Sequence, residues 1–336
     1  MLVCLFVDDL AIGIRDPSEK GRFIKAMEKA GFKLTSEETI DAFLGIKFDK
    51  LPDGAFNLTQ PALIKRIIED TGMENCNKSP TPATPNQPLA KDPDGELMSD
   101  RWSYPSIVGA LLYLSCNSRP DICFAVSQVA RFTHCPKQSH ATAVKRIVRY
   151  LACTKDQGTI MRPDGTLELN CMSDSDFAGL YNVDPPEELT SAQSRMGFLI
   201  KLGSCTVIAK SSLISSICLA TAEAEYYALS HCLQALIPIR RVLEEMIAKL
   251  NAPEELRATI STRAAVDNNA ALLLAQNHRL TSRTRYYHTQ AHHFWQHCGE
   301  TFQMVPIESA LMDADYLTKP MPRAGFEANR KRVQGW

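Results

Sequence analysis

The order of strands and helices expected in the second half of this 336-residue chain limits its fold more than any other feature. Alternating apolar residues predict three strands in succession, and a tight turn at Gly203 joins the second of them to the third. A long helical pattern follows, and after it come a strand, a short helix and a last strand. The expected strands are 166–171, 196–202, 205–210, 264–267 and 301–306, and the expected helices are 222–250 and 270–275. Three strands followed by alternating helices and strands indicate an α/β fold.

The first half predicts a smaller unit and then an irregular segment. Its expected strands and helices are 1–7, 17–30, 42–49, 55–58 and 61–71. Five prolines between Pro80 and Pro93 then fall among Ser, Thr, Asn and Asp, which are residues that build no core. We expect an extended linker or a long surface arm at that point.

The net charge of −1 conceals a basic segment. Residues 1–100 hold 12 basic and 17 acidic side chains, residues 101–155 hold 8 and 1, and the remainder hold 17 and 20. The basic residues of the middle segment gather around a helical pattern at 141–151, as a surface facing phosphate groups would require. A solvated helix face without a partner is the alternative. The residues in question are Lys137, Lys145, Arg146, Arg149 and Lys155.

Composition excludes several classes of protein. The eleven cysteines contain no Cys-x-x-Cys pair, which excludes zinc ribbons and thioredoxin-like sites and predicts reduced thiols. No run of about 18 apolar residues occurs, so we expect neither a membrane span nor a signal peptide.

Acidic residues recur where strands are expected to end and where the long helix begins. One carboxylate from each of four elements, converging at one edge, would hold two divalent ions about 3.5–4 Å apart and activate water for phosphodiester hydrolysis. Acids that cap helices are the competing interpretation. The clusters are Asp174 with Asp176, Glu223 with Glu225, Asp267, and Asp313 with Asp315.

A further acidic pair, Asp8 and Asp9, directly follows the first apolar strand. Adjacent strand residues point to opposite faces, so both carboxylates reach one site only at a turn. Paired carboxylates at a hairpin tip can hold magnesium for phosphoryl transfer, whereas two acids in a surface turn need have no ligand.

These motifs in their order resemble the C-terminal part of the Pol polyprotein of copia-type LTR retrotransposons, in which a reverse transcriptase is followed by a connection region and a ribonuclease H domain. Residues 180–190, with Pro185 and Pro186, look like an insertion relative to that family. The resemblance is carried by Phe6-Val7-Asp8-Asp9-Leu10, Phe43-Leu44-Gly45-Ile46, Leu58-Thr59-Gln60, residues 104–114, Arg119-Pro120-Asp121-Ile122, Arg149-Tyr150-Leu151, residues 173–179, Ala222-Glu223-Ala224-Glu225-Tyr226, Asp267-Asn268 and residues 314–320.

The resemblance implies an α/β, ribonuclease H-like mixed sheet with helices, preceded by a partial reverse-transcriptase palm and thumb and a connection region. We expect a truncated palm and thumb at 1–73 and a linker at 74–100. The connection region at 101–163, the ribonuclease H domain at 164–322 and a tail at 323–336 would follow.

The resemblance also implies the site. Asp174, Glu225, Asp267 and Asp315 would be the catalytic, metal-binding carboxylates, while Asp8 and Asp9 would be polymerase metal ligands. Asp176, Glu223 and Asp313 would be neighbours. For Glu223 this agrees with helix geometry, since two residues turn a side chain by about 200°. Asp174 and Asp176 lie on one side of a strand, so the choice between them stays open. The cofactor would be Mg²⁺, for which Mn²⁺ can substitute.

The implied function is a ribonuclease H that cleaves the RNA strand of RNA–DNA hybrids by two-metal hydrolysis, joined to a reverse transcriptase fragment. Only seven residues precede Asp8, so we expect no polymerisation by this chain alone. A catalytically inactive, nucleic-acid-binding remnant of a decayed retrotransposon is the alternative. Expected partners are RNA–DNA hybrid, DNA, RNA and the remaining Pol segments (palm, fingers and integrase), with no membrane. We expect a cytoplasmic, virus-like-particle or nuclear location without secretion.

Basic and aromatic residues would contact nucleic acid. An aromatic, basic helix is expected near 286–297, and a structural helix is an equal interpretation of it. His288 and His292 are four residues apart, but zinc is disfavoured because no acidic or Cys partner is nearby. The expected contacts are Lys145, Arg146, Arg149, Lys210, Arg283, Arg285 and His293.

Overall fold

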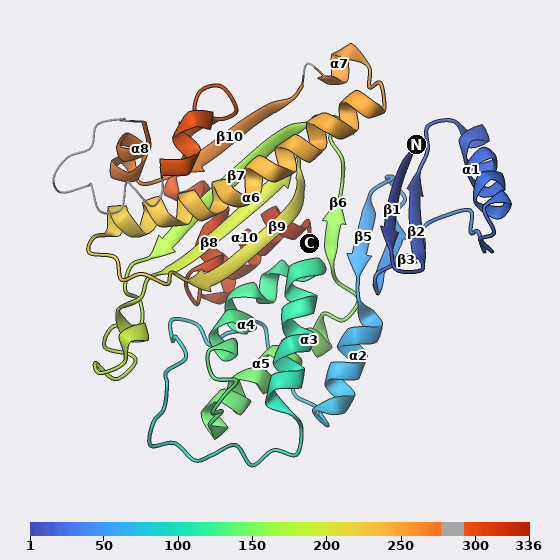
Figure 1. The fold of residues 1–336 in the computed structure, drawn as a ribbon. Helices are drawn as coiled ribbons and strands as arrows, with labels where there is room; N and C mark the ends of the chain where they lie inside the picture. The colour runs from blue at the N-terminus through green and yellow to red at the C-terminus, as the bar shows by residue number, and fades with distance from the viewer. Residues whose placement is uncertain (258, 277–291) are drawn as a thin grey trace.

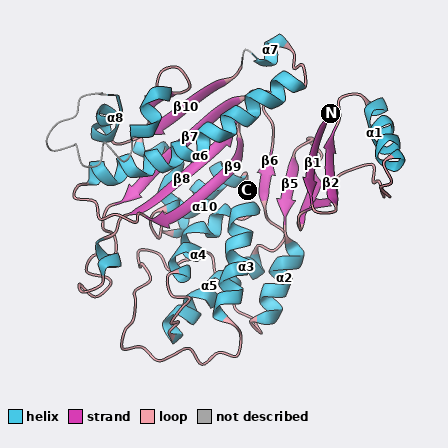
Figure 2. Ribbon diagram, in the orientation of Figure 1, coloured by secondary structure: helices cyan, strands magenta, loops and turns pink. Residues whose placement is uncertain are grey.

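The computed structural model describes residues 1–257, 259–276 and 292–336 of the chain. The second half of these residues forms a five-stranded sheet crossed by a long helix (Figures 1 and 2). The strands β7 (Glu168–Asp176), β8 (Arg195–Leu202) and β9 (Cys205–Leu213) are antiparallel neighbours. The strands β10 (Ser261–Val266) and β11 (Gln303–Pro306) add to the other side of β7 in parallel. The resulting order, β11-β10-β7-β8-β9, mixes parallel and antiparallel neighbours, which confirms the expected α/β class with a mixed sheet and helices.

The 29-residue helix α6 (Thr221–Lys249) lies across this sheet. Its buried residues Tyr226, Leu229, Leu233 and Leu236 recur every three or four positions, which places them on one face of the helix. That face packs on the apolar side of the strands, including Phe198. This packing places the first turns of α6 at the edge of the sheet where β7 and β10 end.

Residues 42–163 and the C-terminal helix form one packed unit. A four-stranded antiparallel sheet joins β3 (Ala42–Phe43), β4 (Ile46–Lys50) and β5 (Phe56–Thr59) to β6 (Thr159–Met161), about a hundred residues later. The helices beside it are α2 (Pro61–Asp70), α3 (Tyr104–Asn117), α4 (Cys123–Ala130) and α5 (Gln138–Cys153). The C-terminal helix α10 (Arg323–Gln334) buries Phe326 and Val333 in the same apolar core. The segments expected as separate at 1–73, 101–163 and 323–336 thus share a sheet or a core.

The remaining described elements are short or peripheral. The hairpin β1 (Leu2–Phe6) and β2 (Asp9–Gly13) is a separate two-stranded sheet, and α1 (Pro17–Lys29) follows it. No described helix has the length and apolar character needed to cross a membrane. The short helices are α7 (Glu254–Arg257), α8 (Asn269–Gln276), η1 (Pro120–Ile122), η2 (Leu189–Ala192), η3 (His292–His297), η4 (Ser309–Leu311) and η5 (Asp313–Leu317).

The proline-rich arm, residues 74–100, is docked on α4 and α5. Because an extended chain has no internal hydrogen bonds, its carbonyl groups need outside donors. Lys137 Nζ donates to the carbonyl oxygens of Pro93 and Gly95 at 3.1 and 2.8 Å, and Arg131 Nη1 donates to that of Leu89 at 3.0 Å. Part of the basic segment therefore binds the chain itself.

The expected insertion at 180–190 also contacts this arm. Asp184 is buried, its carboxylate accepts a hydrogen bond from the backbone N–H of Lys91 at 2.8 Å, and it pairs with Arg131. Lys91 pairs in turn with Glu188. The insertion thus ties the five-stranded sheet to the arm.

Candidate metal centre

Three of the predicted carboxylates meet at one edge of the five-stranded sheet. Asp174 lies near the end of β7, Asp267 directly follows β10, and Glu225 lies in the second turn of α6. Because β7 and β10 are parallel neighbours, their carboxyl ends reach the same edge. One ligand oxygen from each of the three lies within 4.8 Å of the others, the spacing of a group that can hold a cation.

The environment of Glu225 disfavours its charged form. Burial, followed by the negative charges of Asp174 and Asp267, raises the pKa of Glu225 to about 8. Its Oε1 atom accepts a hydrogen bond from the Ser175 N–H at 3.3 Å. Its Oε2 atom is buried and has no hydrogen-bond partner within the described part of the chain. A buried carboxylate oxygen without a donor, in a group of three acids, fits a bound divalent cation.

Asp174 is held by the segment that follows Asp315. Burial, with the charges of Asp315 and Asp267, raises the pKa of Asp174 to about 6, although the Thr318 hydroxyl lowers it by donating a hydrogen bond to Oδ2. Gly197 lies opposite Asp174 in the register of β7 and β8. A Cβ atom at Gly197 would come within 2.9 Å of Thr318 Cγ2, so the glycine lets this segment approach.

Asp315 lies near the three acids but outside their group. Its Oδ1 atom forms an ion pair with Lys319 Nζ at 3.0 Å, and its charge acts on Asp174. Although burial alone would lower the pKa of Lys319, the carboxylates of Asp174, Asp315 and Asp176 raise it. A half-exposed ammonium group therefore lies among the acids on the Asp315 side.

Two of the three acids expected as neighbours, Asp313 and Glu223, have partners elsewhere, while the charge of Asp176 acts on Lys319. Asp313 is buried and forms ion pairs with Lys201 and Arg332 at 2.7 and 2.5 Å. Glu223 Oε2 accepts a hydrogen bond from the Leu219 N–H at 2.8 Å. Asp176 is opposite Arg195 in the strand register, and burial raises its pKa. None of them belongs to the acidic group found among the described residues.

Asp8 and Asp9 lie at the exposed tip of the β1–β2 hairpin. The turn between the strands contains Val7 with φ of 52°, a left-handed conformation. The described residues place no third metal-ligating side chain with this pair.

The residues predicted to contact nucleic acid differ in whether they have partners within the chain. Lys145 pairs with Asp100 at 2.5 Å, and Arg146 Nη2 donates to the Thr81 hydroxyl at 2.9 Å, so both bind the proline-rich arm. Lys210 is exposed on β9. Burial lowers the pKa of His293, and neither of its ring nitrogens has a partner in the described chain. Arg283, Arg285, His288 and the first half of the expected helix near 286–297 lie outside the described residues.

Sequence reasoning did not single out Thr318, Lys319 or Gly197. The first two stand three and four residues after Asp315, within the motif at 314–320, so their closeness to it in the sequence was a usable signal. Gly197 gave no signal, because its role depends on a segment about 120 residues later.

Known proteins match the chain along nearly its whole length. The reverse transcriptase (RNA-dependent DNA polymerase) family matches residues 1–85. The retrovirus-related Pol polyproteins from transposons RE1 and RE2 of Arabidopsis thaliana are 28% and 27% identical over 325 and 331 residues. These matches cover 96% and 98% of the chain but 21% of each relative, so the chain spans about a fifth of their length.

A solved structure, the N-terminal RNase H domain of a Mycobacterium tuberculosis protein fused to maltose-binding protein, is 13% identical with a TM-score of 0.29. That match covers 49% of this chain and 98% of the other. With relatives of one kind along its length and a reverse transcriptase match at its start, the chain is similar to the Pol polyproteins of copia-type plant retrotransposons.

Proposed function

We propose that the five-stranded unit is a ribonuclease H that cleaves the RNA strand of RNA–DNA hybrids by two-metal hydrolysis. The observation that supports it best is the convergence of Asp174, Glu225 and Asp267 at the end of the central strands. These residues would hold Mg²⁺, or Mn²⁺ in its place, and Asp315 would contribute from the other side. When bound, the cations supply a water of lowered pKa and offset charge on the phosphate.

The chain's own residues prepare this site. Asp174 and Glu225 must both lose protons before they bind a cation, so cation binding is expected to strengthen as the pH rises toward 8. The Thr318 hydroxyl orients Asp174, and the Ser175 N–H orients Glu225. Selection of hybrid would come from 2′-hydroxyl contacts on one strand and backbone shape on the other.

We propose that the reverse transcriptase part supports the five-stranded unit and does not polymerise DNA by itself. Asp8 and Asp9 are exposed on a hairpin, and no other described carboxylate shares a metal group with them. The remaining Pol segments would have to supply the other parts of a polymerase site.

The test is cleavage of a hybrid whose RNA strand is labelled. In Mg²⁺ the protein should release fragments with 3′-hydroxyl and 5′-phosphate ends and leave DNA duplex intact. Asp267→Asn should reduce the rate at least about a hundredfold, because it removes a cation ligand. Asp156→Asn, an exposed acid in the other unit, is the matched control. Equal rates for Asp267→Asn and the parent protein would refute the site. Salt-dependent hybrid binding without cleavage in Mg²⁺ or Mn²⁺ would instead indicate an inactive remnant.

A further inference from the structure

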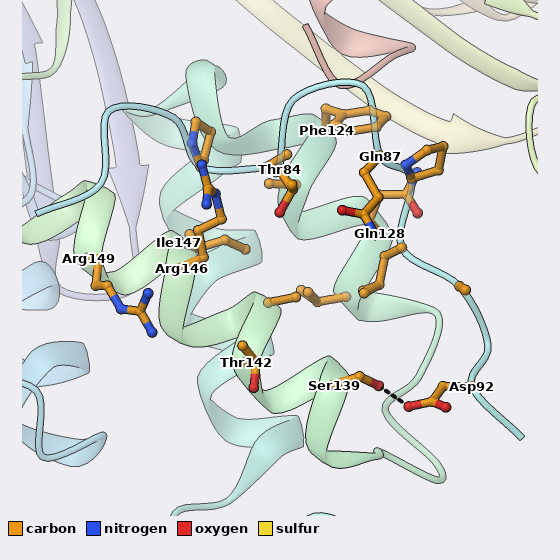
Figure 3. A pocket seen from close by; sticks show the side chains of 18 residues that line it. Thr84, Gln87, Asp92, Phe124, Gln128, Ser139, Thr142, Arg146, Ile147 and Arg149 are labelled. Carbon is orange, nitrogen blue, oxygen red and sulfur yellow. Dashed lines mark hydrogen bonds between the residues drawn. The ribbon is translucent and has the colours of Figure 1, made fainter. Parts of the chain in front are cut away.

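A cavity of about 470 Å³ lies between the proline-rich arm and the helices α4 and α5, away from the acidic group (Figure 3). Residues 139, 142, 143, 146 and 147 of α5 line one wall, at the three- and four-residue spacing of a single helix face. Phe124 and Gln128 of α4 line another wall, and residues 82–90 of the arm close the space. Its volume is within the range of sites for small organic ligands, about 300–1,000 Å³.

One end of the cavity carries two guanidinium groups and no anion. Arg146 Nε is buried without a hydrogen-bond partner in the described chain, although Nη2 reaches Thr81. The described residues give the Arg149 side chain neither a hydrogen bond nor an ion pair. Burial and the charge of Arg149 both lower the pKa of Arg146, so the two cations repel each other. Asp92, the one carboxylate among the lining residues, lies at the other end, where it accepts a hydrogen bond from Ser139.

The body of the cavity is apolar with a few amide and hydroxyl groups. Phe124 and Ile147 are buried, and prolines and Leu89 of the arm face them. Gln128 is buried and accepts a hydrogen bond from Arg131 at 3.3 Å, which leaves its amide nitrogen to donate. Gln87, Thr84 and Thr142 are exposed at the opening. Apolar walls suit an aromatic ring, and the amides suit the polar edge of a nucleobase.

We propose that this cavity is a binding site for a nucleoside phosphate, with the phosphate on Arg146 and Arg149 and the base between Phe124 and the arm. A phosphate would satisfy the buried Arg146 Nε atom and relieve the repulsion between the guanidinium groups. A fatty carboxylate would meet the arginines but would leave the Gln128 amide without a partner. The nucleotide is either free or the end of a strand. The inference does not depend on hybrid cleavage.

The test is calorimetry of the full chain at low salt with adenosine 5′-monophosphate, adenosine, inorganic phosphate and octanoate. The monophosphate should bind at least about tenfold more tightly than adenosine or phosphate. Arg149→Gln should weaken it at least about tenfold, since it removes a charge-assisted contact. Ala143→Leu, which fills the cavity and keeps its charge, should do the same. Lys155→Gln is the matched control, because Lys155 is an exposed basic residue of the same segment outside the cavity.

The outcomes separate the sources of the ligand. Tighter binding of a 5′-phosphorylated oligonucleotide than of its 5′-hydroxyl form supports capture of a strand end, and binding of the mononucleotide alone supports a free nucleotide. The proposal is overturned if the monophosphate does not bind, if octanoate binds in its place, or if Lys155→Gln weakens binding as much as Arg149→Gln. Loss of hybrid cleavage in Asp267→Asn with nucleotide binding unchanged would show that the two sites are separate.

Discussion

At the scale of single residues, Glu225 couples the cation site to folding. Its pKa rises from 4.5 to about 8 on folding, so the folded state holds the proton more tightly than the unfolded state. Without cations, this contribution to stability is complete below about pH 4.5 and is lost as the pH rises through about 8. Glu225→Gln should reduce the decline to the part that the raised pKa of Asp174 contributes, and should stabilise the cation-free protein at pH 8 by on the order of 3 kcal/mol.

Urea unfolding in a chelator at pH 5 and pH 8 measures this effect. Glu74 is an exposed acid in the other unit, and Glu74→Gln serves as the control. This variant should keep the parental decrease in the free energy of unfolding between pH 5 and pH 8. Added Mg²⁺ should stabilise the parent protein more at pH 8 than at pH 5 and should not stabilise Glu225→Gln. A parental pH dependence in Glu225→Gln would contradict the assignment of this proton.

Lys319 is the second residue whose role is local. Its ammonium group pairs with Asp315 and acts on Asp174, so it competes with a cation for the same carboxylates. Lys319→Gln should therefore strengthen Mn²⁺ binding by about tenfold, as measured by calorimetry. Lys47→Gln breaks a comparable ion pair, with Asp49, on another sheet and should leave Mn²⁺ binding unchanged. Unchanged or weaker binding in Lys319→Gln would show that the lysine does not compete.

At the scale of elements, most strands and helices were predictable because their periodicity is local. The helix expected at 222–250 is Thr221–Lys249, and the strand expected at 205–210 is Cys205–Leu213. The first strand was expected to end at 171 but continues to Asp176. Pairing with β8 keeps the polar residues from 173 onward in the sheet and carries Asp174 to its edge. The strand order and the meeting of the acids depend on distant segments. The positions of the acids offered their convergence as one of two interpretations, and the family resemblance favoured it.

The proline-rich arm shows what composition alone did not indicate about the basic segment. Charge counts predict a surface facing phosphate groups, but carbonyl oxygens and carboxylates of the arm compete for the same cations. Lys137→Met should release residues 93–95 and lower the free energy of unfolding by about 1–2 kcal/mol, because one exposed and one half-buried hydrogen bond from the ammonium to carbonyl oxygens are lost. Limited proteolysis should then cut the arm faster. Cleavage of Lys155→Met at the same increased rate would show that loss of charge alone loosens it.

At the scale of the whole molecule, a buried ion pair joins the middle of the chain to its C-terminal end. Arg119 and Asp121 are fully buried and lie 2.8 Å apart, and the guanidinium outweighs burial to hold the pKa of Asp121 below its usual value. The Tyr150 hydroxyl donates to Asp121 at 2.5 Å, and Gln334 of α10 donates to it at 3.3 Å. Because α10 also packs against β6 and β9, the two sheets are linked through this helix.

Breaking this pair should therefore affect both sheets together. Asp121→Asn leaves the Arg119 charge buried without a counter-charge and should cost about 3–5 kcal/mol. Asp53→Asn removes an exposed ion pair with Arg162 and should cost less than about 1 kcal/mol. Scanning calorimetry should show one transition that shifts down as a whole in Asp121→Asn, with loss of Mn²⁺ binding at the same temperature. The opposite result would be a second transition that keeps the parental midpoint, with Mn²⁺ still bound up to that temperature. It would mean that the five-stranded unit folds independently of the helices to which the C-terminal helix joins it.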